Sequence, residues 1–212
     1  MTRRCLLAPI VEHHHAADLL GQAAAAWLAG DAARCAALIK EADFEALASF
    51  SQRVTGSIDP EIHRQRARPR AASAPTVSGD RMPSGSTTLE VFRRDGWRCR
   101  FCDVRVVSPE ARKCFTEAFT AAARWGRVNH EKHAALAALT ASIDHVQPFS
   151  RGGTSLFENL VTACGPCQFG RGEWLLSEVE VEDPRTRPPI VDSWDGLVRV
   201  VGVNRARRRS SM

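Results

Sequence analysis

The sequence predicts an α+β protein in which a small strand–loop–strand–helix unit is pinned by two cysteine pairs and follows a short all-helical module. In the first quarter of the chain, apolar residues recur at spacings of three and four, which is typical of helices. After residue 140, two short apolar segments read as strands. Two C-x2-C pairs, Cys99/Cys102 and Cys164/Cys167, frame this second region.

Composition excludes several classes of protein. Of 212 residues, 44% are hydrophobic and 25% are charged, close to the averages for globular proteins, which excludes a collagen-like chain, a coiled-coil rod and a wholly disordered chain. No apolar stretch approaches the roughly 20 residues of a membrane span. The apolar run near the start is interrupted by Pro9 and meets Glu12, so it does not read as a secretory signal. We therefore expect a cytoplasmic protein with no membrane segment.

Residues 1–60 are predicted to form a helical accessory module. Helices are expected over residues 16–28, 32–42 and 44–54. Gly30 and Asp31 are typical of a helix stop followed by an N-cap. So short a module buries little apolar surface. We expect it to dock onto the rest of the chain, onto a second copy in a homodimer, or onto a partner protein.

Two further segments have the composition of connections. Residues 61–86 are rich in Arg, Pro, Ser and Ala without apolar periodicity, which predicts a basic linker. Residues 181–212 are predicted to be a Pro-rich and basic C-terminal tail. The net charge of +5 is concentrated in basic tracts at residues 64–70 and 205–209. Such tracts suit phosphate contact, and a solubilising role is the alternative.

The seven cysteines indicate a metal site. An odd number in a cytoplasmic chain argues against a disulfide framework, whereas two C-x2-C pairs are typical of a four-cysteine Zn2+ site. Residues 103–163 separate the pairs, so we expect an insertion, helical by pattern, over residues 109–141. The other three cysteines are expected to be small buried hydrophobes. They are Cys5, Cys35 and Cys114.

The second domain is predicted over residues 87–180. Its expected elements are a helix at 87–94, a strand at 142–146, a polar loop at 147–159, a strand at 160–163 and a helix at 168–176. His13-His14-His15 is expected to be a solvated run, and His130 and His133 are expected to cap or solvate the insertion. Trp97, Trp174 and Trp194 are expected to be packing residues.

Short motifs lie at informative spacings within this domain. They are Cys99-Arg100-Phe101-Cys102, Asp144-His145-Val146-Gln147-Pro148, Arg151-Gly152-Gly153, Glu158-Asn159-Leu160 and Cys164-Gly165-Pro166-Cys167. Together they resemble the HNH endonuclease family, whose ββα-metal core is often built on four zinc-binding cysteines. The resemblance covers about residues 87–176, with the helical segment as an insertion. It implies structural Zn2+ and metal-dependent hydrolysis of phosphodiester bonds in DNA, with RNA as the alternative substrate.

The resemblance also implies a role for each matching residue. His145 would be the general base, because imidazole titrates near neutrality. Asn159 would position the base or its loop, and Asp144 would bind a catalytic Mg2+ or Mn2+ through hard carboxylate oxygen. Nucleic-acid contacts would come from Arg151, Gly152, Gly153 and Arg171.

Gln168 departs from the family pattern. The family usually has His or Asn at this position as a second metal ligand, and Gln offers a carbonyl oxygen on a side chain one methylene longer. Two alternatives to an active endonuclease therefore stay open. The chain could be a cleavage-deficient, zinc-stabilised module that binds nucleic acid, or a subunit of a larger nuclease or defence assembly.

Overall fold

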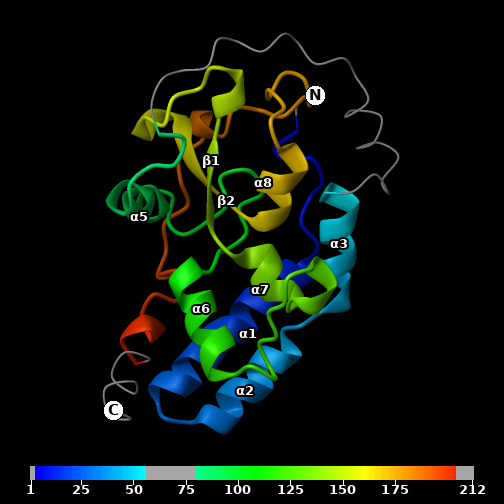
Figure 1. Ribbon diagram of the computed structural model, residues 1–212, viewed down its shortest axis with the longest axis vertical. Helices are drawn as coiled ribbons and strands as arrows, with labels where there is room; N and C mark the ends of the chain where they lie inside the picture. The colour runs from blue at the N-terminus through cyan, green and yellow to red at the C-terminus, as the bar shows by residue number, and fades with distance from the viewer. Residues whose placement is uncertain (1–2, 56–79, 204–212) are drawn as a thin grey trace.

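The computed structural model describes residues 3–55 and 80–203 (Figure 1). Its main elements are α1 (Val11–Leu28), α2 (Ala32–Glu41), α3 (Glu45–Thr55), α5 (Gly85–Arg94), α6 (Pro109–Ala118), α7 (Ala134–Leu139), β1 (Ser142–His145), β2 (Leu160–Ala163) and α8 (Gly165–Arg171). Helices surround a two-stranded sheet, so the predicted α+β class is confirmed. Most of the predicted linker, including the basic tract at residues 64–70, lies outside the described residues, as does the tract at 205–209.

The N-terminal helices are joined as the sequence predicts. Gly30, which follows the C-cap residue Ala29 of α1, has a φ of +84°, a conformation that favours glycine. Asp31 then caps α2, because its side chain accepts a hydrogen bond from the backbone N–H of Arg34 at 2.9 Å. The predicted stop and N-cap are therefore confirmed.

The first helix begins at Val11, five residues before the predicted start. His13 consequently lies on the same helical face as Ala16, Ala17 and Leu20, which are all buried. The His13 ring is 1% exposed and packs edge-on against Phe50, with 4.7 Å between ring centroids. Burial lowers the pKa of His13. The expected solvated run is therefore wrong for His13, because the helix extends through it.

The three N-terminal helices pack against the later part of the chain. Helix α3 contacts α7 and α8, and α1 contacts α7 (Figure 1). The approach of α3 to α8 is close, because a Cβ atom at Gly170 would lie 2.3 Å from Val54 Cγ1. On the other side, the Trp27 ring packs against Phe115 and Phe119. Of the three docking partners considered for this module, the structure shows the rest of the chain.

The two strands form an antiparallel hairpin whose residues are largely buried. The register pairs Ser142 with Ala163 at one end and His145 with Leu160 at the other. Helix α5 packs near β2, and α8, which follows β2 directly, packs against β1. The hairpin therefore has one end beside Cys164 and another beside His145, and residues 146–159 connect the strands at the His145 end.

The insertion is helical at both of its ends. Helix α6 is capped by Ser108, whose hydroxyl accepts from the backbone N–H of Ala111 at 3.0 Å. Helix α7 is capped by His133, whose Nδ1 accepts from the N–H of Leu136 at 3.3 Å. His133 Nε2 lies 2.7 Å from the carbonyl oxygen of Ile39, and burial lowers its pKa to about 4. The expected capping role of His133 is confirmed.

The described part of the C-terminal segment packs onto the fold. Trp194 Nε1 donates to the carbonyl of Val106 at 2.8 Å, and Leu197 and Val200 are fully buried. Trp97 and Trp174 are buried too, at 6% and 2% exposure, which confirms them as packing residues. Across residues 3–55 and 80–203, the structure contains no helix with the length and apolar character needed to cross a bilayer.

Candidate functional site

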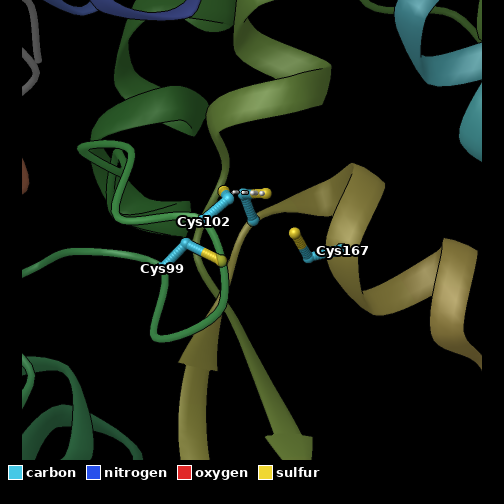
Figure 2. A group of neighbouring side chains, drawn as sticks. Cys99, Cys102 and Cys167 are labelled. Atoms are coloured by element: carbon cyan, nitrogen blue, oxygen red, sulfur yellow. Dashed lines mark hydrogen bonds between the residues drawn. The ribbon is translucent and has the colours of Figure 1, made fainter. Parts of the chain in front are cut away.

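The two predicted cysteine pairs meet at one end of the hairpin. Cys99 and Cys102 lie on a turn, Cys164 follows β2 directly as the N-cap of α8, and Cys167 lies in the first turn of α8. Figure 2 shows sulfur atoms from both pairs turned toward one another, and all four sulfurs lie within 4.8 Å of each other. The Sγ atoms of Cys102 and Cys164 are 3.7 Å apart. A tetrahedral Zn2+ with Zn–S distances of about 2.3 Å requires sulfur–sulfur edges of about 3.8 Å.

Electrostatics at this cluster favour a cation. Hydrogen bonds to neighbouring cysteine sulfurs, together with burial, raise the pKa values of Cys102 and Cys167 well above their usual range. Four thiolates therefore cannot coexist here on their own. A bound Zn2+ would make them tenable, because metal binding replaces the thiol protons. The donor set, the spacing and the mutual crowding all fit a structural zinc site.

The opposite end of the hairpin carries Asp144, which forms a bidentate ion pair. Arg171 Nη2 donates to Asp144 Oδ1 at 2.6 Å, and Arg171 Nε donates to Oδ2 at 3.0 Å. Both side chains are buried: that of Asp144 is 9% exposed and that of Arg171 is 2% exposed. Burial raises the pKa of Asp144, while the Arg171 charge opposes that rise. A divalent ion at these oxygens would meet the guanidinium charge, so the arrangement does not fit the expected metal ligand.

Arg171 uses its remaining donors on the backbone. Nη2 also donates to the carbonyl of His145 at 2.5 Å, and Nη1 donates to the carbonyls of Trp174 at 2.8 Å and Val146 at 3.4 Å. The side chain expected to contact nucleic acid therefore lies inside the protein and ties α8 to the end of β1.

His145 lies at the end of β1 with an exposure of 8%. Its Nε2 is 3.0 Å from Ser155 Oγ, and that hydroxyl is 2.9 Å from the carbonyls of Asp80 and Arg81. With the hydroxyl hydrogen directed at a carbonyl, Oγ accepts from Nε2–H and the Nδ1 lone pair stays available. Burial lowers the pKa of His145, and the charges of Arg81 and Arg171 lower it further. The ring is therefore neutral at neutral pH.

Asn159 holds the loop that follows His145. Its Oδ1 accepts from the N–H of Gln147 at 2.9 Å, and its Nδ2 donates to the carbonyls of Gln147 at 3.0 Å and Thr154 at 2.7 Å. The side-chain amide thus bonds to backbone groups in the way that the backbone of a neighbouring strand would. The loop is fixed on both sides of the turn that starts at Pro148.

The remaining expected nucleic-acid contacts have structural roles here. Arg151 is 4% exposed and pairs with Glu178 at 3.0 Å. Gly152 has a φ of +83° at the end of a 3-10 turn, and a Cβ atom at Gly153 would lie 1.8 Å from the carbonyl oxygen of Gln147. Loop closure accounts for both glycines, and Glu178 engages the guanidinium of Arg151.

Gln168, the expected second metal ligand, is anchored to the hairpin. Its Nε2 donates to the carbonyl of Ile143 at 2.9 Å. Sequence reasoning brought Asp144, His145, Asn159 and Gln168 to one region, but it missed Ser155 and the pairing of Arg171 with Asp144. Ser155 is one of many hydroxyls in a polar loop, and a pair separated by 27 positions leaves no local pattern.

Comparison with known families supports the assignment of this region. Residues 130–168 match the family model described as HNH endonuclease. The matched segment contains His145, Asn159 and the second cysteine pair, and it begins after the first pair. No curated protein and no solved structure gives a match. The HNH resemblance is thus confirmed for this segment, and it indicates a function related to nucleic acids.

Proposed function

We propose that this chain is an HNH-type endonuclease that hydrolyses phosphodiester bonds of DNA, with His145 as the general base. The observation that carries the proposal is the position of His145 within the matched segment. It ends a strand whose other end is fixed by the zinc site, and its loop is held by Asn159. This geometry holds an imidazole rigidly on a small frame, as catalysis by a positioned base requires.

His145 would take a proton from the water that attacks phosphorus. The water oxygen forms the new P–O bond, the bond to the 3′-oxygen breaks, and the leaving oxygen takes up a proton. A base must be unprotonated to act, and the lowered pKa of His145 meets that condition at neutral pH. With Ser155 Oγ accepting from Nε2–H, Nδ1 is the ring nitrogen that keeps its lone pair for this proton.

The metal requirements of this proposal separate into two parts. Zn2+ fits the four cysteines as a structural ion. The family resemblance adds a catalytic Mg2+ or Mn2+, but its expected ligand Asp144 is paired with Arg171. Gln168 is bonded to Ile143 through its amide nitrogen, and its amide oxygen takes no part in that bond. The proposed reaction therefore does not use an ion at Asp144. Nicking in Mg2+, in Mn2+ and in EDTA shows whether cleavage needs a divalent ion.

Plasmid nicking by the zinc-loaded protein tests the proposal. Supercoiled DNA is incubated with Mg2+, with Mn2+ and with EDTA, and structured RNA is the parallel substrate. We expect His145→Ala to abolish nicking while it keeps the zinc content of wild type and stays folded at the assay temperature. His130→Ala is the matched control, because His130 is an exposed histidine of the insertion, and it should cut like wild type. Cutting by His145→Ala at the wild-type rate would refute the assignment of the base.

A second candidate function is a zinc-stabilised module that binds nucleic acid without cleaving it. The observation favouring it is that Asp144, Asn159 and Gln168 are all bonded to protein groups. Gel retardation of DNA by a protein that is inert with every ion would support this alternative. Cutting that appears only when a co-purifying protein is present would instead make the chain a subunit of a larger assembly.

A further inference from the structure

The pair formed by Asp144 and Arg171 joins the zinc end of the fold to the base. Arg171 ends α8, a helix of seven residues that starts at the cysteine cluster. Its guanidinium holds the Asp144 carboxylate through two hydrogen bonds and the backbone carbonyl of His145 through a third. A shift of α8 would therefore move the backbone of His145 directly.

The chemistry of the pair makes a metal at Asp144 unfavourable. A buried carboxylate needs a compensating charge, and a bidentate guanidinium supplies that charge together with matched geometry. The same guanidinium also donates to the carbonyls of His145, Val146 and Trp174. If it moved away from the carboxylate, these buried carbonyls would lose their hydrogen-bond donor. A divalent ion would have to displace this whole set.

We propose that Arg171 is a positioning residue for His145 and that Asp144 is its counter-ion rather than the ligand of a divalent ion. The proposal deepens the proposed endonuclease function and rests on it for the role of His145. It predicts that the guanidinium shape matters as well as the charge, because a lysine cannot bind the carboxylate in bidentate fashion and still reach the carbonyls.

Metal binding tests the role of Asp144 without relying on cleavage. Zinc-loaded wild type and Asp144→Asn are titrated with Mn2+ alone, and free Mn2+ is measured by electron paramagnetic resonance. We expect the two proteins to retain Mn2+ to the same extent, within about twofold. A loss of Mn2+ affinity of about tenfold or more in folded Asp144→Asn would show a metal ligand and overturn the proposal.

Turnover kinetics test the role of Arg171. Arg171→Lys, which keeps the charge, should lower kcat by about tenfold or more while KM changes little, because a small displacement of the base is costly in the transition state. Arg94→Lys is the matched control. Arg94 binds Asp95 through Nε and Nη2 and also holds the carbonyls of Phe157 and Leu160, but it makes none of these bonds to β1.

We expect Arg94→Lys to retain a kcat within about threefold of wild type, and thermal unfolding of both lysine variants shows how much of each kcat change accompanies a loss of stability. Equal losses of kcat in the two lysine variants would overturn the positioning role, since stability alone would then explain both. If the wild type cuts no substrate, the proposed function fails on that ground. The Mn2+ comparison still decides between counter-ion and metal ligand, so the two failures are distinguishable.

Discussion

The two ends of the β1–β2 hairpin differ in what completes them. At the cysteine end, four sulfur atoms gather within 4.8 Å and interact with one another, which raises the pKa values of Cys102 and Cys167. At the His145 end, the polar side chains are bonded to other protein groups, with Asp144 on Arg171 as the strongest pair. The cysteine end has the donor set for a stabilising ion, whereas the other end is held by hydrogen bonds of the chain itself.

The difference indicates that the two ends of the hairpin have different structural roles. A four-cysteine site would fix the backbone both before and after the sheet in the sequence, because Cys99 and Cys102 precede β1 while Cys164 and Cys167 follow β2. Strand β1 connects this site to His145. Hydrogen bonds of Asn159 and Arg171 then hold the backbone at and just after His145. Removing the ion should therefore affect the whole domain, whereas changes at the other end should have local effects.

Zinc removal should have the largest effect. Structural Zn2+ supplies on the order of 10–16 kcal/mol of apparent binding energy, which exceeds the stability of most small domains. A chelator under reducing conditions should unfold residues 87–176, measured by the loss of near-ultraviolet circular dichroism as zinc is released. Cys99→Ser should behave in the same way without a chelator.

Cys5→Ser is the matched control for the zinc prediction. The Cys5 thiol lies 3.0 Å from the carbonyl of Leu7, and a serine hydroxyl can make the same bond. This variant should keep one zinc per chain by elemental analysis. Soluble, folded wild-type protein without zinc would contradict the prediction.

Loosening the loop at the His145 end should have the next largest effect. Asn159→Ala removes three hydrogen bonds and leaves backbone groups of Gln147 and Thr154 without their partner. Since a buried unsatisfied group costs about 1–3 kcal/mol, we expect the free energy of unfolding to fall by about 3 kcal/mol. Urea unfolding measures this loss, and kcat should fall with it because His145 is next to the loop.

Asn129→Ala is the control for the loop prediction. Asn129 is exposed, and its Oδ1 accepts from Lys132 Nζ at 3.1 Å. Surface substitutions of this kind change stability by about 0.5 kcal/mol or less. If Asn159→Ala unfolds at the same urea concentration as Asn129→Ala, contacts other than those of Asn159 hold the loop.

The sequence predicted one end of the hairpin better than the other. The cysteine pairs have a spacing imposed by tetrahedral coordination, so Cys99, Cys102 and their partners were identifiable without a structure. The strand at 160–163 followed equally from a local pattern, whereas for His133 capping was one of two expected roles. The bond of Arg171 to Asp144 could not be predicted in this way, because it depends on how α8 is oriented across β1. The burial of Arg171 is likewise set by tertiary packing and not by its neighbours in the sequence.

The smallest expected effect concerns Gln168, and it separates two explanations of that residue. As a metal ligand, Gln168 replaced by the shorter Asn of the family pattern should keep or raise cleavage. As a strand anchor, it donates Nε2–H to the carbonyl of Ile143 at 2.9 Å, and the shorter Asn would lose that bond. The net value of such a bond is about 1 kcal/mol, which corresponds to a fall in Tm of about 2–4 °C for a chain of this size.

Comparing Gln168→Asn with Gln168→Glu makes the test sharper. Glu has the length of Gln but places a carboxylate oxygen against the Ile143 carbonyl oxygen, so as an anchor it should lower Tm more than Asn does. As a metal ligand, Glu should instead raise Tm in the presence of Mn2+, because a carboxylate binds hard cations better than an amide does. A Tm for Gln168→Glu at or above that of wild type without Mn2+ would contradict the anchor, whereas a rise on adding Mn2+ would show that an ion binds beside residue 168. A Tm that stays below that of Gln168→Asn with and without Mn2+ would place Gln168 with Arg171 among the residues that fix α8 against the hairpin.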